Sequence, residues 1–95
     1  MAGISKTVVS IKPGKMEEIY KLIDSQSHYV TEVAGLIGFL VAETGDHEIT
    51  IIGVYDKTES AESASPTVQK VFAEGAELMA SPPNRGVYSG KWYSS

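Results

Sequence analysis

Two strand-like apolar runs separated by a short polar turn constrain the fold of this chain more than any other feature of its sequence. The runs span residues 36–43 and 48–56. A Gly-Asp pair between two such runs is a recognised signal for a two-residue hairpin loop. We therefore predict an antiparallel hairpin in which Gly45 and Asp46 form the loop.

The segments on either side of this hairpin complete a β-α-β-β-α-β order. Residues 4–11 are β-branched and partly alternating, which predicts a first strand, and residues 86–93 predict a last one. Residues 15–34 and 66–80 carry apolar side chains at helical spacing, and the polar connection at 57–64 has room for one helical turn. This order predicts a ferredoxin-like α+β fold with a four-stranded antiparallel sheet, and 95 residues suit a single domain.

The predicted hairpin is apolar on both faces. A Gly45-Asp46 loop places Leu36, Gly38, Leu40, Ile51, Gly53 and Tyr55 on one face. The opposite face then carries Ile37, Phe39, Val41, Ile52 and Val54. In this topology both helices cover the same face, and a monomer rarely leaves such a second apolar face in water. We therefore expect a homodimer that packs sheet to sheet through Ile37, Phe39, Val41, Ile52 and Val54.

The composition argues against several classes of protein. Twelve acidic and eight basic residues give a net charge of −4, which does not suit a basic nucleic-acid-binding surface. The chain has no cysteine, so it has neither disulfides nor thiolate metal sites. No apolar run approaches the ~18 residues of a membrane span, and the N-terminus lacks the apolar core of a signal peptide. We expect a cytoplasmic protein that binds neither nucleic acid nor membrane.

Three segments carry a resemblance to a known family: Lys12-Pro13-Gly14-Lys15-Met16-Glu17-Glu18, Gly35-Leu36-Ile37-Gly38-Phe39 and Val54-Tyr55-Asp56-Lys57-Thr58-Glu59-Ser60-Ala61. They resemble the entry to the first helix, the second strand and the end of the third strand in antibiotic biosynthesis monooxygenase (ABM)-type domains. The similarity spans nearly the whole chain and implies one dimeric α+β barrel domain over residues 1–95. Characterised members include cofactor-independent monooxygenases of aromatic polyketides and haem-degrading monooxygenases.

The residues that build the haem-degrading site of that family are missing. An Asn, a Trp and a His form that site, and the matching positions here hold Thr7, Tyr55 and residues 65–66. His28 and His47 are predicted to lie in solvent without a nearby partner for a metal ion. The sequence offers no other axial ligand, so we expect neither haem, nor another cofactor, nor a tightly bound metal.

The resemblance implies that Tyr55 points between the sheet and the helices, and alternation from Thr7 defines the rest of that inner face. A predicted Gly38–Gly53 pair would leave a spot beside Tyr55 without side chains. This spot is explained either by close helix–sheet packing or by a small-molecule cavity. In the cavity interpretation, Tyr55 and Thr7 are the candidate catalytic residues, and the substrate-binding residues are Tyr20, Leu36, Gly38, Gly53 and Trp92.

Two classes of function fit these residues. The resemblance implies a cofactor-independent monooxygenase, an oxidoreductase that acts on a small aromatic or quinol-type substrate. That chemistry needs an apolar pocket, a hydrogen-bond donor for the substrate anion and the exclusion of water. The alternative is a non-catalytic dimeric module that binds a small apolar or aromatic molecule, and a third is isomerase or lyase chemistry on the same barrel. Ligand-induced thermal stabilisation without turnover would favour the binding module.

Overall fold

A computed structural model describes the backbone of residues 1–95 and every side chain except those of Tyr29 and Val30. The helical spacing in the sequence places Val30 on an apolar helix face, and that expectation lies outside the described side chains. No helix in the described part of the chain is long and apolar enough to cross a membrane.

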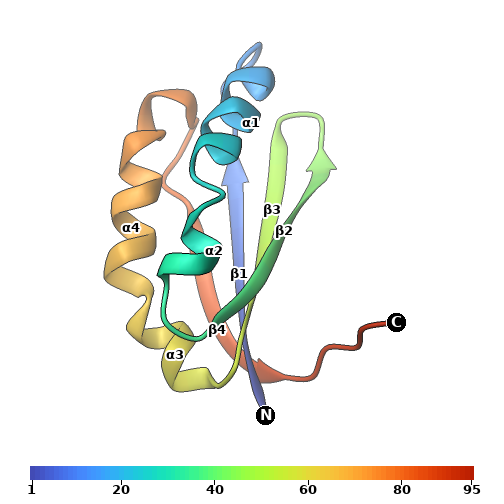
Figure 1. Cartoon of the computed structure of the whole chain (residues 1–95). Coiled ribbons are helices and arrows are strands. Elements are labelled where there is room, and N and C mark those ends of the chain that lie inside the picture. The colour runs from blue at the N-terminus through green and yellow to red at the C-terminus, as the bar shows by residue number, and fades with distance from the viewer.

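The chain forms one antiparallel sheet with its helices on one face (Figure 1). The sheet order is β2-β3-β1-β4. The elements in chain order are β1 (Ala2–Ser10), α1 (Met16–Ser25), α2 (Tyr29–Glu32), β2 (Leu36–Gly45), β3 (Glu48–Tyr55), α3 (Thr58–Ser63), α4 (Ser65–Glu74), a 3-10 turn (Ala76–Leu78) and β4 (Asn84–Gly90). This arrangement confirms the predicted ferredoxin-like α+β fold.

The single helix predicted over residues 15–34 is wrong, because α1 ends at Ser25 and only one further turn, α2, follows it. The Ser25 hydroxyl donates a hydrogen bond to the Leu22 carbonyl oxygen at 2.6 Å, and the Gln26 N–H donates to the Ile23 carbonyl oxygen at 3.0 Å. Such bonds to the third residue back tighten and end a helix. Ser27 and His28, which have modest helix propensity, come next in the chain, so the helix does not continue beyond Ser25.

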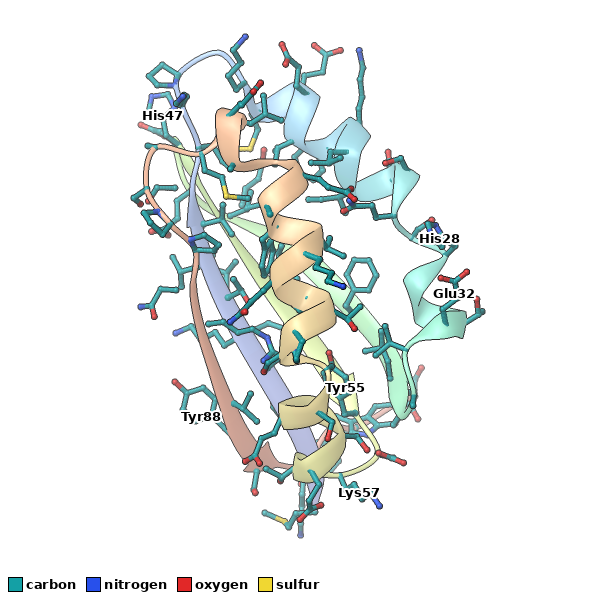
Figure 2. The ribbon with its side chains drawn as sticks, turned by 90° about the vertical axis from the view of Figure 1, so that its left-hand side faces the viewer. His28, Glu32, His47, Tyr55, Lys57 and Tyr88 are labelled. Carbon is teal, nitrogen blue, oxygen red and sulfur yellow. The ribbon has the colours of Figure 1, made fainter. Side chains whose placement is uncertain are left out.

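The interior is divided into two apolar clusters. One lies between α1 and the sheet and buries Val9, Ile11, Ile19, Ile49 and Met79. The other lies beneath α3 and the start of α4 and buries Tyr55, Ala61 and Ala64. Tyr55 is therefore a core residue at the lower end of the sheet, as Figure 2 shows.

The pairing of β2 with β3 differs from the predicted register. Leu36 pairs with Tyr55 as predicted, but the register shifts between Leu36 and Gly38 and again between Glu43 and Gly45. Each shift leaves one residue of β2 as a bulge without a direct partner. Asp46 and His47 form the turn, and neither has the positive φ that the favoured two-residue hairpin turns require.

The shifted register exchanges the two faces in the middle of β2, since one residue of slip turns every side chain over. Phe39 pairs with Gly53 and Val41 pairs with Ile51, on the face toward the helices. Their predicted place on the outer face is therefore wrong, and so is the inward place of Gly38. The outer face instead carries the apolar side chains of Ile4, Val8, Leu40, Ile52, Val54 and Tyr88, together with the exposed Lys6 opposite Ile52.

A pair of cysteines at Val41 and Ile51 tests this register, because the chain has no cysteine of its own. Opposed residues of antiparallel strands have Cα atoms about 4.5–5.5 Å apart, within the span of a disulfide. We expect the Val41→Cys, Ile51→Cys protein to form the disulfide on mild oxidation, measured as the loss of both thiols under denaturing conditions.

The Val41→Cys, Thr50→Cys protein is the matched control, because these residues are opposite each other only in the register predicted from a Gly45-Asp46 loop. We expect its thiols to stay free under the same oxidation. Ready disulfide formation in this control, with free thiols in the first variant, would contradict the shifted pairing.

Candidate functional site

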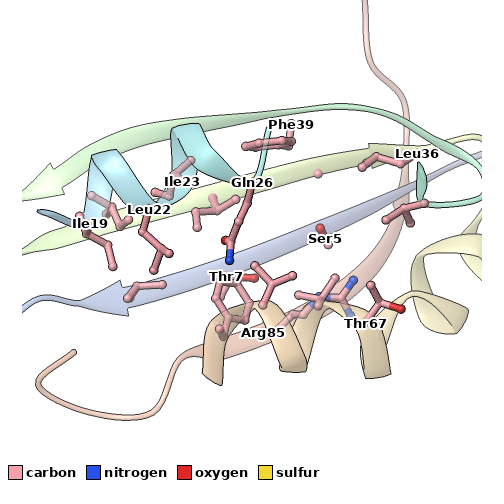
Figure 3. A pocket seen from close by; sticks show the side chains of 18 of the residues that line it. Ser5, Thr7, Ile19, Leu22, Ile23, Gln26, Leu36, Phe39, Thr67 and Arg85 are labelled. Atoms are coloured by element: carbon pink, nitrogen blue, oxygen red, sulfur yellow. The ribbon is translucent and has the colours of Figure 1, made fainter. Parts of the chain in front are cut away.

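A cavity of about 120 Å³ lies between the inner face of the sheet and helices α1 and α4 (Figure 3). It sits where the two core clusters meet, and most of its wall is aliphatic or aromatic. The side chains that form this apolar wall include Ile19, Leu22, Phe39, Ile51, Val68 and Phe72. A largely apolar enclosure with few polar groups is typical of a small-molecule site.

Three buried hydroxyl groups lie in the wall of the cavity. Ser5 and Thr7 alternate along β1, and Tyr55 ends β3. Thr7 is only 2% exposed and Tyr55 only 3%. Among the described residues, no protein group forms a hydrogen bond with the side-chain hydroxyl of any of the three, and each hydroxyl oxygen keeps some accessible surface. Each hydroxyl therefore remains available to form a hydrogen bond with a polar atom of a bound ligand.

Two longer polar side chains complete the cavity wall. Gln26, just after α1, donates a hydrogen bond from its side-chain amide to the Glu74 carboxylate and so links α1 to α4. Arg85, on β4, donates from Nη1 to the Ser65 Oγ at 2.6 Å and from Nη2 to the Ala61 carbonyl oxygen at 3.0 Å. Arg85 therefore ties β4 to the junction of α3 and α4.

The structure brings part of the predicted site together. Thr7, Leu36, Gly53 and Tyr55 all line the cavity. Their predicted roles in catalysis and substrate binding remain predictions. Gly53 does not face Gly38, because its partner on β2 is Phe39.

Three predicted site residues lie outside the cavity wall: Tyr20, Gly38 and Trp92. Tyr20 packs against the cluster beneath α1. Gly38 follows the first register shift and faces outward, where an added methyl group would meet no described atom within 4 Å. Trp92 is 45% exposed and follows the end of β4, in a C-terminal tail that points away from the sheet (Figure 1).

Because Gly53 has no side chain, the side chains of Ser5 and Tyr55 lie close to its backbone. A methyl group added there would lie 2.5 Å from the Ser5 Oγ and 3.2 Å from Cε1 of the Tyr55 ring. The space above Gly53 is therefore shared by Tyr55 and Ser5 and is not filled by a helix. Neither the packed-helix nor the open-cavity interpretation of the sequence describes it fully.

Sequence reasoning missed Arg85, the only arginine of the chain. The predicted last strand began at residue 86, whereas β4 begins at Asn84. A predicted strand extended by two residues would have included Arg85, which the structure pairs with Thr7 of β1. Phe39 was also missed, because the register error turned it outward.

The two histidines lie apart from this cavity. His28 Nε2 is 3.7 Å from the Glu32 carboxylate on the exposed surface at α2, and His47 is in the hairpin turn (Figure 2). Within the described part of the chain, no three His, Cys, Asp or Glu side chains are grouped to hold a metal ion.

Comparison with known proteins gives structural matches only. No protein-family model and no curated protein sequence matches the chain. A candidate antibiotic biosynthesis monooxygenase from Nitrosomonas europaea is 16% identical, with 99% of this chain and 94% of that chain covered and a TM-score of 0.78. Rv0793 from Mycobacterium tuberculosis is 16% identical, with both chains fully covered (100% each) and a TM-score of 0.75.

A variant of SnoaB, described as a cofactor-independent oxygenase from Streptomyces nogalater, is also similar in structure. It is 9% identical, with 97% of this chain and 95% of that chain covered and a TM-score of 0.74. At such low identities the likeness establishes the fold and not the reaction. The chain has the fold of the antibiotic biosynthesis monooxygenase (ABM)-type proteins.

Proposed function

We propose that this protein is a cofactor-independent oxygenase that binds a small aromatic or quinol-type substrate in the cavity between sheet and helices. The observation that carries the proposal is the cavity itself, with apolar walls around the unpartnered hydroxyls of Thr7 and Tyr55. The fold shared with SnoaB, described as a cofactor-independent oxygenase, supports the reaction type.

The volume of the cavity limits the size of the substrate. An engineered apolar cavity of about 150 Å³ is known to hold benzene. The cavity here, at about 120 Å³, therefore suits one aromatic ring. A larger, polycyclic substrate would exceed this volume.

A hydroquinone illustrates the chemistry, because it supplies all the electrons that the reaction needs. Hydroquinone and O₂ give hydroxyquinone and water: the ring loses four electrons, one oxygen atom enters the ring, and the other leaves as water. The protein contributes by stabilising the substrate anion that reduces O₂. In this role the Tyr55 hydroxyl donates a hydrogen bond to the anionic oxygen, and the apolar walls exclude water.

Tyr55→Phe tests this role, because it removes the hydroxyl and keeps the buried ring. Loss of one donor to a developing oxyanion typically lowers kcat by about 10²–10³-fold. We expect a loss of that size in hydroquinone-dependent O₂ uptake, with ¹⁸O from O₂ appearing in the product of the unsubstituted protein.

The control is Tyr93→Phe, which removes the same hydroxyl from a tyrosine that is 87% exposed in the C-terminal tail after β4. This control should retain the activity. Undiminished O₂ uptake in a folded Tyr55→Phe protein would contradict the proposed role of Tyr55.

A binding module without catalysis is the second candidate function. It is favoured by the make-up of the cavity wall, where no Asp, Glu or His side chain occurs among the described residues. General acid–base catalysis usually relies on such groups. The two functions are separated by one comparison: a binding module is stabilised thermally by the aromatic ligand and consumes no O₂.

We also propose that two copies of the chain pack through the outer faces of their sheets. The helices cover only the inner face of the sheet (Figure 1). On the outer face, Leu40 is 54% exposed and Tyr88 is 57% exposed. At ~25 cal/mol per Å², burying a few hundred Å² of apolar surface per subunit gives several kcal/mol before the cost of association. Ile37, Ile52 and Val54 remain in this interface from the sequence prediction, and Leu40 replaces the inward-facing Phe39 and Val41.

Sedimentation at micromolar concentration tests the dimer, and we expect about twice the monomer mass. Leu40→Glu should shift the protein to a monomer, because it places a charge within an apolar interface. Ser63→Glu, which adds the same charge at an exposed position of α3, is the control and should leave the mass unchanged. An unsubstituted protein that sediments as a monomer would contradict the proposal.

A further inference from the structure

Arg85 is the only charged side chain in the cavity wall of the described chain. It is half-buried on the inner face of β4, directly opposite Thr7 of β1. Within the described residues it forms no ion pair, since both of its hydrogen bonds go to neutral oxygen atoms, those of Ser65 and Ala61. A partly buried cation without a counter-ion is unfavourable, so an anion in the cavity would be stabilised here.

The contacts of Arg85 hold its guanidinium group in place without neutralising it. Ser65 and Ala61 accept two of the five N–H donors of an arginine, which leaves three for another partner. Thr7 on the neighbouring strand is 2% exposed as a residue, and its hydroxyl has no hydrogen-bond partner among the described residues. One end of a mostly apolar cavity thus combines a positioned cation with an unused hydroxyl donor.

We infer that the ligand of this cavity is a single-ring aromatic carboxylate, bound with its carboxylate on Arg85 and Thr7 and its ring between the apolar walls. The inference rests on the proposed function and adds the charge of the substrate to it. A guanidinium group matches the geometry of a carboxylate, and charge-assisted hydrogen bonds are stronger than neutral ones. A carboxylic acid is also ionised near neutral pH without help from a base, which suits a wall that has no Asp, Glu or His among its described side chains.

Benzoate and benzamide are the probes that test this inference, because they share a ring and a planar head group and differ in charge. Calorimetric titration of the unsubstituted protein should show benzoate binding about tenfold or more tightly than benzamide. Arg85→Gln should lower the affinity for benzoate to about that for benzamide and leave benzamide binding unchanged. Arg85→Lys should retain an intermediate preference for benzoate, because it keeps the charge and loses the planar fork.

Lys70→Gln is the matched control, since it removes one positive charge from an exposed position on α4. Its preference for benzoate should equal that of the unsubstituted protein, because exposed charges are strongly screened by salt. If Arg85→Gln does not fold, the test uses Arg85→Lys instead. Its preference for benzoate over benzamide should then be lower than that of Lys70→Gln.

Each alternative outcome is distinct. Equal binding of benzoate and benzamide, or an unchanged benzoate affinity in the Arg85 variants, would overturn the carboxylate inference and leave the aromatic cavity intact. It would also assign Arg85 a purely structural role in bracing α3 against β4. If neither benzoate nor benzamide binds, both the carboxylate inference and the proposed single-ring site are contradicted.

Discussion

The pairing of β2 with β3 determines what each face of the sheet can do. Two one-residue shifts, before Gly38 and after Glu43, turn the middle of β2 so that Phe39 and Val41 point toward the helices and Leu40 points away. In an unshifted register Leu40 would take the place of Phe39 against the cavity. The shape of the cavity and the apolar character of the outer face therefore depend on the same short stretch of backbone hydrogen bonds.

A polar strip crosses the inner face of the sheet at its centre. Ser5 and Thr7 of β1 lie between Gly53 and Ile51 of β3 on one side and Val87 and Arg85 of β4 on the other. Ser5 and Thr7 carry hydroxyl groups where aliphatic side chains would extend the apolar core, and no described protein group forms a hydrogen bond with these hydroxyls. Polar residues within an apolar core are common at functional sites. Ser5 and Thr7 are such residues, and both line the cavity.

Much of the architecture follows from local sequence patterns. The order of strands and helices, the hairpin and the inward direction of Thr7, Leu36, Gly53 and Tyr55 all follow from periodicity and from the resemblance to ABM-type domains. The alternation along β1 and β3 is regular, so the inner face of these strands is predictable. The outcome differs along β2, because its bulges depend on the turn geometry and on tertiary packing, which the sequence pattern does not specify.

The parts of the site that the sequence does not reveal lie at element ends. Arg85 escapes notice because β4 begins two residues earlier than its aromatic pattern suggests, and Trp92 is misplaced because the strand ends at Gly90. Helix α1 is shorter than its apolar spacing suggests, because Ser25 and Gln26 satisfy the final carbonyl groups and end it. Strand and helix ends depend on individual hydrogen bonds, whereas the interior of an element repeats a pattern.

The central claim is that the space between the sheet and helices α1 and α4 receives an aromatic ring. The most direct measurement is a set of intermolecular nuclear Overhauser effects between the ring protons of bound hydroquinone and the protein methyl groups. We expect contacts with the methyl groups of Thr7, Ile51 and Val68, which line the cavity from both of its sides. Contacts with Leu40 and Ile52 of the outer face instead, or none with the cavity wall at saturating ligand, would contradict it.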